Sequence, residues 1–357
     1  MGEDIIYNLN QLGWEEFNKK NNDIYIEEGF SVARVFAEHK HIYKLFTEVG
    51  EVLAEVSGKL RHEALDGDEF PSVGDWVVVS LRIEEKRATI HKVLPRKSKF
   101  SRKVAGVNTK EQIVASNIDT VFLVNALNKD FNARRIERYL IMAWESGANP
   151  IILLSKADLC MDIEEKLRET EMVAVGVPIH IISAQDKLGL EELNQYLQPG
   201  RTIALLGSSG VGKSTLLNFL AGEELQETKE VREYDDRGRH TSTSREMFLL
   251  DSGAIMIDTP GMRELQLWGG SEGISEAFED IEELATQCRF SDCMHKKEPG
   301  CAIKKAIEDG FLDEKRFKSY ETLQKEIKLI EKKQNDINRI ASNKKSKEYI
   351  NHKYRGL

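Results

Sequence analysis

The sequence has no apolar stretch near the ~20 uninterrupted residues that a membrane-spanning helix needs. Its first residues, MGEDIIYNLNQ, also lack the basic start and the apolar run of a secretory signal. These absences argue against a membrane protein and a secreted one, and they predict a cytoplasmic protein. With 357 residues, 40% of them hydrophobic and 31% charged, the chain can build two or three globular domains.

Cysteine is scarce, with four residues in all, and three of them crowd with a histidine into residues 288–301. In a reducing compartment this crowding favours a metal over disulfides. The spacing is C-x4-C-x-H-x5-C, and the four residues are Cys288, Cys293, His295 and Cys301. Three thiolates and an imidazole predict one structural Zn²⁺ in a closed tetrahedral site, with no open position for catalysis. The alternative is that these cysteines cluster without binding a metal ion. Cys160 lies far from them in the sequence, and we expect it to be buried and to have no role in the site.

The chain also lacks an excess of basic residues, since its net charge is −9, which argues against indiscriminate binding of nucleic acid. The charge is uneven. Residues 315–357 hold thirteen Lys and Arg against five Asp and Glu, a net charge of +8, so the rest of the chain carries −17. This asymmetry indicates a basic C-terminal arm on an acidic body, although a solvated charged helix has the same composition.

The patterning predicts a multidomain chain. Five short alternating or β-branched runs before residue 95 favour an OB-like barrel, with another small β fold as the alternative. Apolar strands then alternate with helices, as in a mostly parallel α/β sheet, and the last part is helical. We expect an N-terminal extension over 1–28, the barrel over 29–95, a linker over 96–112, the α/β domain over 113–270 and a helical zinc-binding domain with the basic tail over 271–357.

The stretch GSSGVGKST follows an apolar strand and precedes a helix, and it satisfies G-x-x-x-x-G-K-[ST]. In such a loop the backbone N–H groups surround phosphate oxygens, Lys213 reaches the β and γ phosphates, and Ser214 ligates Mg²⁺. The motif therefore predicts a nucleoside triphosphate with Mg²⁺. The residues of this phosphate loop are Gly207, Ser208, Ser209, Gly210, Val211, Gly212, Lys213, Ser214 and Thr215.

Two further loops indicate guanine. SKAD (Ser155, Lys156, Ala157, Asp158) resembles the N/T-K-x-D loop of GTPases, in which the aspartate accepts the guanine N1 and N2 protons; Ser155 departs from the usual Asn or Thr. Ser183 and Ala184 follow the next strand, where GTPases contact the guanine carbonyl. The earlier NKDF at 128–131 is a decoy, because Phe131 stands where the aspartate should be.

The stretch IDTPG matches D-x-x-G, with Asp258 expected near Mg²⁺ and the Gly261 amide near the γ phosphate. A hydroxyl-rich switch segment precedes it, and Mg²⁺ ligation is expected from one of Thr241, Ser242 and Thr243. The order of motifs is guanine loop, SA loop, phosphate loop, switch and D-x-x-G. This order predicts a circularly permuted GTPase, which a parallel sheet tolerates because its strands keep their neighbours.

Many GTPases orient the attacking water with a glutamine directly after the D-x-x-G glycine, but here Met262 stands at that position. His240 in the switch is the candidate for orienting the water in place of the glutamine. The alternative is that His240 is a solvated loop residue without this role. His240 and Lys213 are thus the candidate catalytic residues.

The motifs GSSGVGKST, GRHTST and DTPG, followed by the C-x4-C-x-H-x5-C module, closely resemble the ribosome small subunit-dependent GTPase family, known as RsgA or YjeQ. The resemblance covers nearly the whole chain. It implies GTP hydrolysis in late maturation of the small ribosomal subunit, stimulated by the subunit and coupled to release. It further implies a role in hydrolysis for His240.

We therefore expect GTP, GDP, the small ribosomal subunit and its rRNA as partners, no membrane, and a monomer. The barrel, zinc module and basic tail would meet rRNA through shape and phosphate contacts. One rival hypothesis is a switch protein with a non-ribosomal protein partner. The other is an RNA-binding scaffold that holds GTP but hardly hydrolyses it, which Met262 would permit.

Overall fold

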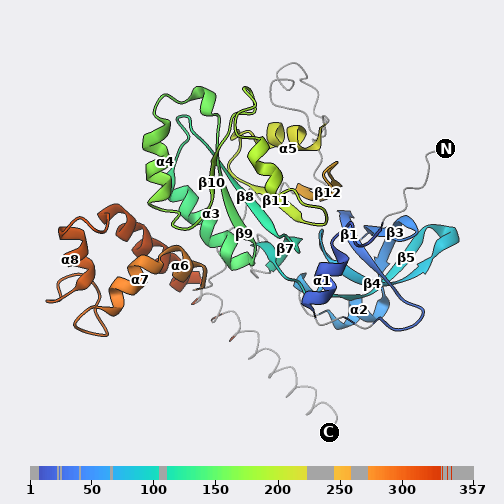
Figure 1. The fold of residues 1–357 in the computed structure, drawn as a ribbon. Coiled ribbons are helices and arrows are strands. Elements are labelled where there is room, and N and C mark those ends of the chain that lie inside the picture. Colours follow the sequence, from blue (N-terminus) through green and yellow to red (C-terminus); the bar gives the residue numbers. More distant parts are fainter. Residues whose placement is uncertain are drawn as a thin grey trace, which may run out of the picture. The chain divides into compact units, whose positions relative to one another are not determined.

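The computed structural model (Figure 1) describes residues 8–21, 24, 26–39, 42–64, 67–103, 111–222, 245–258, 272–330, 332, 336 and 339. The chain divides into two units. The first holds residues 1–104 and 110–266, and the second holds 105–109 and 267–357. Within the described part of the chain, no helix is both long and apolar enough to cross a membrane.

Five strands near the N-terminus close into a barrel, in the order β1-β2-β3-β5-β4 with β4 pairing back to β1. The alternating sequence explains this, because every second side chain points inward to a core that includes Val35, Leu45, Val77 and Ile90. The expectation of a five-stranded OB-like barrel is confirmed. The strands are β1 (Ser31–His39), β2 (Ile42–Thr47), β3 (Gly50–Val56), β4 (Trp76–Arg82) and β5 (Arg87–Val93), with α2 (Gly58–Glu63), η1 (Gly67–Glu69) and η2 (Ile83–Glu85) between them.

The α/β part is a sheet in the order β10-β9-β8-β11-β13-β12, in which only β12 runs antiparallel to its neighbours. Three of the five parallel strands, β8, β9 and β11, are nearly continuous apolar runs, as expected for strands buried on both faces. The strands are β8 (Thr120–Ala126), β9 (Asn149–Ser155), β10 (Ile179–Ile181), β11 (Thr202–Leu206), β12 (Arg245–Leu249) and β13 (Ile255–Asp258).

Helices connect these strands and pack on the sheet. The bounds are α3 (Ala133–Ser146), η3 (Ala157–Leu159), α4 (Ile163–Glu171), η4 (Glu191–Gln195) and α5 (Lys213–Ala221). The α3 helix begins where the side chain of Asn132 accepts from the Arg135 amide, and it ends at left-handed Gly147. Residues 191–195 form a 3₁₀ helix, unlike α3, α4 and α5.

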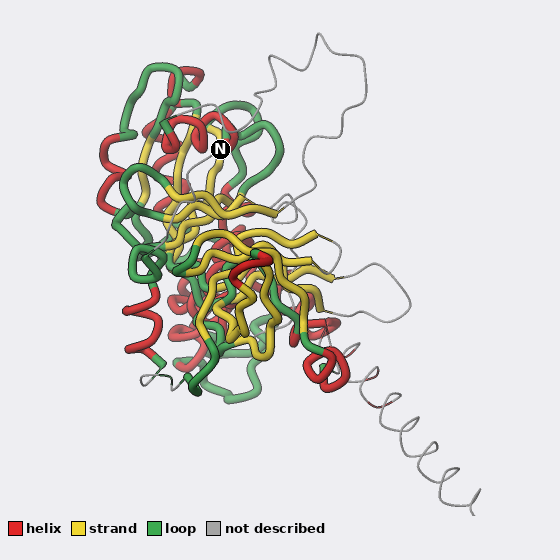
Figure 2. The backbone as a smooth tube through the Cα atoms, turned by 90° about the vertical axis from the view of Figure 1, so that its right-hand side faces the viewer, coloured by secondary structure: helices red, strands yellow, loops and turns green. Residues whose placement is uncertain are grey.

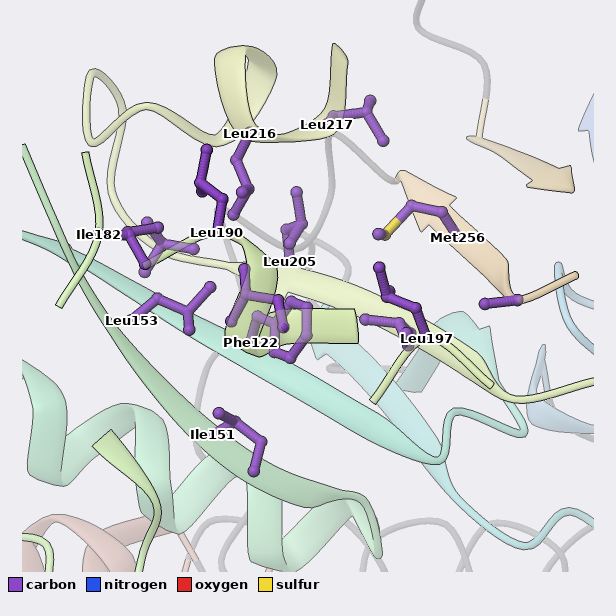
Figure 3. Packing of buried hydrophobic residues seen from close by; sticks show 14 of the residues in the cluster. Phe122, Ile151, Leu153, Ile182, Leu190, Leu197, Leu205, Leu216, Leu217 and Met256 are labelled. Carbon is purple, nitrogen blue, oxygen red and sulfur yellow. The ribbon is translucent and has the colours of Figure 1, made fainter. Parts of the chain in front are cut away.

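One hydrophobic cluster of the α/β part joins α5 and the segment around η4 to the sheet. Figure 3 shows Leu216 and Leu217 of α5 above Phe122, Leu153 and Leu205 of the strands. All five are buried. Burying a Leu or Phe side chain contributes about 1.5–3 kcal/mol, so this cluster fixes α5, and with it the loop before α5, on the sheet.

The barrel and the α/β sheet are hydrogen-bonded into one continuous sheet. Barrel strand β1 pairs antiparallel with β12, with Ala37 opposite Glu246 and Glu38 opposite Arg245. Figure 2 draws the strands in yellow, and in the strand order β1 and β12 are the neighbours that join the barrel to the α/β sheet. A short hairpin of β6 (Lys99–Lys103) and β7 (Glu111–Ser116) follows the barrel, within and just after the segment that we expect to be a linker.

The N-terminal segment, whose role the sequence does not reveal, packs where the two parts meet. Its helix α1 (Trp14–Lys20) places Trp14 and Phe17 against Trp76 of the barrel, with ring centroids 5.0 and 5.8 Å away. Arg34 of β1 is buried and donates to the Leu12 carbonyl, 2.5 Å away, and to Thr202 Oγ1, 2.7 Å away at the start of β11. One barrel side chain thus joins the N-terminal segment to the α/β sheet.

Asp119, just before β8, is another buried charge at this junction. Its carboxylate accepts from Lys97 Nζ at 2.6 Å and from the Thr202 amide at 2.8 Å. Burial raises the pKa of Asp119, but Lys97, the Thr202 amide and Arg34 outweigh burial and hold the pKa below its usual 3.8. Asp119 is therefore a charged structural anchor between the linker region and β11.

The second unit is helical. It contains α6 (Glu272–Ala277), α7 (Glu279–Thr286), α8 (Ala302–Glu308) and a helix over 314–330. Arg316 of the last helix is buried, with its guanidinium 4.9 Å from the ring centroid of Phe278 and 2.7 Å from the Asp280 carboxylate. Most of the expected basic tail after residue 330 lies outside the described residues.

Candidate nucleotide site and candidate metal centre

The expected nucleotide residues gather at one edge of the α/β sheet. The phosphate loop follows β11, the SKAD loop follows β9, the SA loop follows β10, and Asp258 ends β13. These strands are parallel, so their carboxyl ends meet at the same edge, where α/β sheets bind ligands. The permuted chain order thus leaves the loops side by side in space.

The phosphate loop is shaped by glycines. Gly210 and Gly212 adopt φ angles of 82° and 98°, in the left-handed region that favours glycine. A Cβ on Gly207 would collide with the carbonyl oxygen of Val124 in β8. Because α5 begins directly after Gly212, the amides of its first turn face the loop and form an anion-binding end.

Lys213 lies over this loop. Its Nζ donates to the carbonyl oxygens of Gly207, 2.7 Å away, and Ser208, 2.5 Å away. The ammonium is half-buried and held at the phosphate loop by main-chain acceptors. A triphosphate in the loop would offer the ammonium charged acceptors, which form stronger hydrogen bonds than carbonyls do.

Ser155 connects the SKAD loop to the phosphate loop. Its hydroxyl is buried and donates to the carbonyl oxygen of Val211 at 2.7 Å, with the Asn125 carbonyl 3.4 Å away. The departure from Asn or Thr at this position therefore keeps a side-chain donor. The two loops are tied directly to each other.

Asp158 is held by the SA loop. Ser183 is buried and donates to Asp158 Oδ1 at 2.7 Å, while its own oxygen accepts from the Asp186 amide at 3.1 Å. Lys156 has a left-handed φ of 59°, and the Ala157 amide donates to Ile182. These contacts orient the exposed Asp158 carboxylate, whose two oxygens can accept the two adjacent N–H groups of a guanine edge.

The NKDF segment at 128–131, which lacks the aspartate of a guanine loop, contacts the phosphate loop. The sequence does not reveal this contact. Ser208 donates to Asp130 Oδ2 at 3.1 Å, and Arg135 pairs with the same carboxylate at 3.0 Å. The position of NKDF in the fold explains the contact, because NKDF follows β8, and β8 is hydrogen-bonded to the strand before the phosphate loop.

The switch residues lie outside the described part of the chain. These residues are His240, Thr241, Ser242, Thr243, Gly261 and Met262. Asp258 is described at the end of β13, where it stands opposite Glu246 of β12. The described site therefore comprises the phosphate loop, both guanine loops and the first residue of D-x-x-G.

In the second unit, the four expected zinc ligands come together. Cys288 follows α7, Cys301 caps α8, and the donor atoms of Cys288, Cys293, His295 and Cys301 all lie within 4.8 Å of one another. His295 Nδ1 is 3.6 Å from Cys288 Sγ and 3.5 Å from Cys301 Sγ, and these two sulfurs are 4.0 Å apart.

These distances fit a shared metal. A tetrahedral Zn²⁺ with ordinary bond lengths separates two sulfurs by about 3.8 Å and a sulfur from a nitrogen by about 3.5 Å. A disulfide would bring the sulfurs to about 2.05 Å, and all four cysteines are free. The Cys₃His cluster therefore fits a structural zinc site and provides four protein donors.

The family model "RsgA GTPase" matches residues 93–268, and the model "50S ribosome-binding GTPase" matches residues 202–340. A Lactiplantibacillus plantarum protein named "Small ribosomal subunit biogenesis GTPase RsgA 2" is 47% identical over 306 residues, covering 85% of this chain and 86% of the relative. An Opitutus terrae protein named "Small ribosomal subunit biogenesis GTPase RsgA" is 45% identical over 327 residues, covering 89% of each chain.

Among solved structures, YjeQ from Thermotoga maritima is similar with a TM-score of 0.63 and 28% identity, covering 84% of this chain and 98% of that one. YloQ, described as a circularly permuted GTPase, has a TM-score of 0.60 at 23% identity, covering 85% of this chain and 98% of its own. The fold of this chain is therefore shared over most of its length.

Proposed function

The chain belongs to the RsgA GTPase family, and on that premise we propose that it is a GTPase of small ribosomal subunit biogenesis. It is a GTP-hydrolysing enzyme. The observation that carries its nucleotide-binding part is the joining of the two loop systems through Ser155 and Val211, since it lets one ligand meet the guanine-binding carboxylate and the phosphate-binding amides together.

In this proposal the described residues bind and orient the nucleotide. Asp158, held by Ser183, accepts the guanine N1 and N2 protons, and the phosphate-loop amides bind the phosphates. The Lys213 ammonium exchanges its two carbonyl contacts for β- and γ-phosphate oxygens. Ser155 keeps the loops at the spacing that one nucleotide spans.

Mg²⁺ fits the proposed donor set, because hydroxyl and carboxylate oxygens are the ligands that it prefers. Ser214 at the start of α5, Asp258 at the end of β13 and one switch hydroxyl would hold it. When bound it neutralises charge on the β and γ phosphates. The chain's own contribution to hydrolysis is then Lys213 at the phosphates and His240 at the attacking water, with the Gly261 amide near the γ phosphate.

The Cys₃His cluster would hold Zn²⁺, because three thiolates and an imidazole are soft and borderline donors at tetrahedral spacing. Zinc there would tie the loop after α7 to the start of α8. Its role in this chain would be structural, since the protein supplies four donors and would leave no position open for catalysis.

The two ribosomal names point to different subunits, and we favour the small one. The "50S ribosome-binding GTPase" model covers only residues 202–340, whereas relatives named for the small subunit align over at least 85% of the chain. At this coverage the aligned part includes most of the barrel and the Cys₃His cluster. We infer that these parts and the basic tail contact the small subunit and its rRNA, and that a monomer acts in the cytoplasm.

The proposal is tested by measuring GTP hydrolysis alone, with purified small subunits, and with large subunits as control. We expect strong stimulation by small subunits only. Equal rates in all three reactions would contradict the ribosomal proposal and favour the rival switch protein. His240→Ala then separates an enzyme from a GTP-holding scaffold, because only the enzyme loses turnover.

A further inference from the structure

The loop between Cys293 and Cys301 holds a carboxylate that is not among the four expected ligands. Glu298 Oε2 accepts from the amides of Lys296, 2.8 Å away, and Lys297, 2.9 Å away. Glu298 Oε1 accepts from the amide of Met294 at 3.3 Å. One side chain therefore binds the main chain on both sides of His295.

His295 has an unusual backbone. Its φ is 57°, in the left-handed region where a residue with a Cβ is seldom found. The chain bends at residues 295–297, and the amides of Met294 and Lys296, on either side of His295, both donate to the Glu298 carboxylate. In this backbone conformation the His295 ring places Nδ1 3.6 Å from Cys288 Sγ and 3.5 Å from Cys301 Sγ.

We propose that Glu298 is a positioning residue of the metal centre, which holds His295 in its left-handed conformation so that Nδ1 faces the thiolates of Cys288 and Cys301. The proposal rests on the zinc assignment made above. It adds a fifth residue to the centre, one that acts through the main chain of the loop and does not touch the metal.

The charge of Glu298 fits this role. The backbone amides of Glu298 itself and of Lys296 lead the interactions that lower the pKa of the Glu298 carboxyl to about 2, so it is ionised wherever thiolates can bind zinc. A free carboxylate beside three thiolates would be repelled by them. The three amides supply the compensating partial positive charge and direct the carboxylate to the loop.

The His295 ring has a second support. Phe317 of the helix over 314–330 meets the ring edge-on, with centroids 5.9 Å apart. Phe317 limits where the ring can lie but does not set the backbone of the loop. Glu298 is the side chain whose contacts span residues 294–297, so its loss should free the loop while Phe317 remains.

The experiment uses the full chain, stripped of metal under reducing conditions and titrated with zinc against a chromophoric chelator. Glu298→Ala should weaken zinc binding about 10- to 100-fold, the usual effect of losing a residue that orients a ligand. Glu298→Gln keeps one carbonyl acceptor and should lose less. Glu308→Ala, at an exposed glutamate in the same unit, is the matched control and should bind as wild type.

A double-mutant cycle tests whether Glu298 affects zinc binding through His295. If Glu298 acts through His295, then Glu298→Ala should weaken zinc binding less than about twofold in a His295→Ala background, because the oriented ligand is already gone. An equal loss in both backgrounds, or none in the wild-type background, overturns the proposal.

Cobalt(II) distinguishes positioning from ligation. Cobalt-loaded Glu298→Ala should keep the thiolate charge-transfer bands of the wild type, whereas a spectrum that signals a changed ligand set overturns the positioning role. If the wild-type chain itself binds neither zinc nor cobalt, the zinc assignment fails, and the positioning role fails with it. Equal binding by wild type and Glu298→Ala refutes the positioning role alone.

Discussion

The hydroxyl oxygen of Ser155 lies 2.7 Å from the carbonyl oxygen of Val211, so a side chain at the end of β9 holds the middle of the phosphate loop. Both residues are buried. The contact links the loop that would read the base to the loop that would bind the phosphates, although 56 residues separate them in the chain.

Ser155→Ala should weaken GTP and GDP binding by similar factors of about 5 to 10. The buried Val211 carbonyl loses its donor, which costs on the order of 1 kcal/mol or more, and the two loops are no longer tied. Titration with fluorescent nucleotide analogues measures this. Ser155→Thr keeps a hydroxyl and should bind nearly as wild type; equal weakening in both variants would indicate a packing effect instead.

Asp158→Asn should change the preferred base from guanine to xanthine. A carboxylate accepts the N1 and N2 protons of guanine, whereas an amide presents one acceptor and one donor, which matches the N–H and carbonyl of xanthine. We expect GTP affinity to fall about 100-fold or more and XTP affinity to rise, measured by competition. Asp162→Asn, at a residue paired with Lys166, is the control; unchanged base preference in Asp158→Asn would remove this residue from the guanine site.

Local patterns predict most of this fold because they depend on periodicity. The barrel strands alternate, the parallel strands are apolar runs that end in recognisable loops, and the cysteine spacing predicts the cluster at 288–301. Contacts between distant segments leave no such pattern. Nothing in the sequence pairs Arg34 with Thr202, or places Trp14 on Trp76, because tertiary packing decides both.

In the functional sites, too, contacts between distant segments could not be predicted from the sequence. Asp130 reaches Ser208 only because β8 and β11 are neighbours in the sheet, and the role of Glu298 depends on a left-handed residue that no short motif encodes. The domain boundaries, the switch residues and the nucleotide ligands remain predictions.

Removing zinc should unfold the second unit locally and leave nucleotide binding intact. The cluster joins the loop after α7 to α8, whereas the phosphate and guanine loops lie in the other unit. Hydrogen exchange should quicken in residues 279–312 after chelation, with GDP affinity within about twofold of the loaded protein. Cys293→Ser should mimic chelation, and Cys160→Ser, outside the cluster, should not. Loss of GDP binding on chelation would contradict the independence of the two units.

Asp119 should make the first unit acid-sensitive. Its folded pKa lies below the unfolded value of about 3.8, so its stabilisation is present above that pH and is lost as pH falls through the folded pKa. Asp119→Asn should destabilise the protein by about 3 kcal/mol at pH 7, because Lys97 keeps a charge without its partner. The loss should shrink toward pH 3.

Urea unfolding monitored by tryptophan fluorescence at pH 7, 5, 4 and 3 measures this dependence. Glu15→Gln removes an exposed ion pair with Lys19 and should leave the urea unfolding midpoint as in the wild type at each pH. A constant difference between wild type and Asp119→Asn across this range would show that packing, not charge, accounts for the effect.

The pairing of β1 with β12 has a consequence for how the chain avoids self-association. Without the barrel, β12 would be the outermost strand of the α/β sheet, and its unpaired N–H and C=O groups would accept a strand from another molecule. Ala37 and Glu38 occupy that position within the same chain. The barrel thus covers an aggregation-prone edge, and a GTPase domain shortened to begin at residue 113 would have to leave this edge exposed or share it with a second copy.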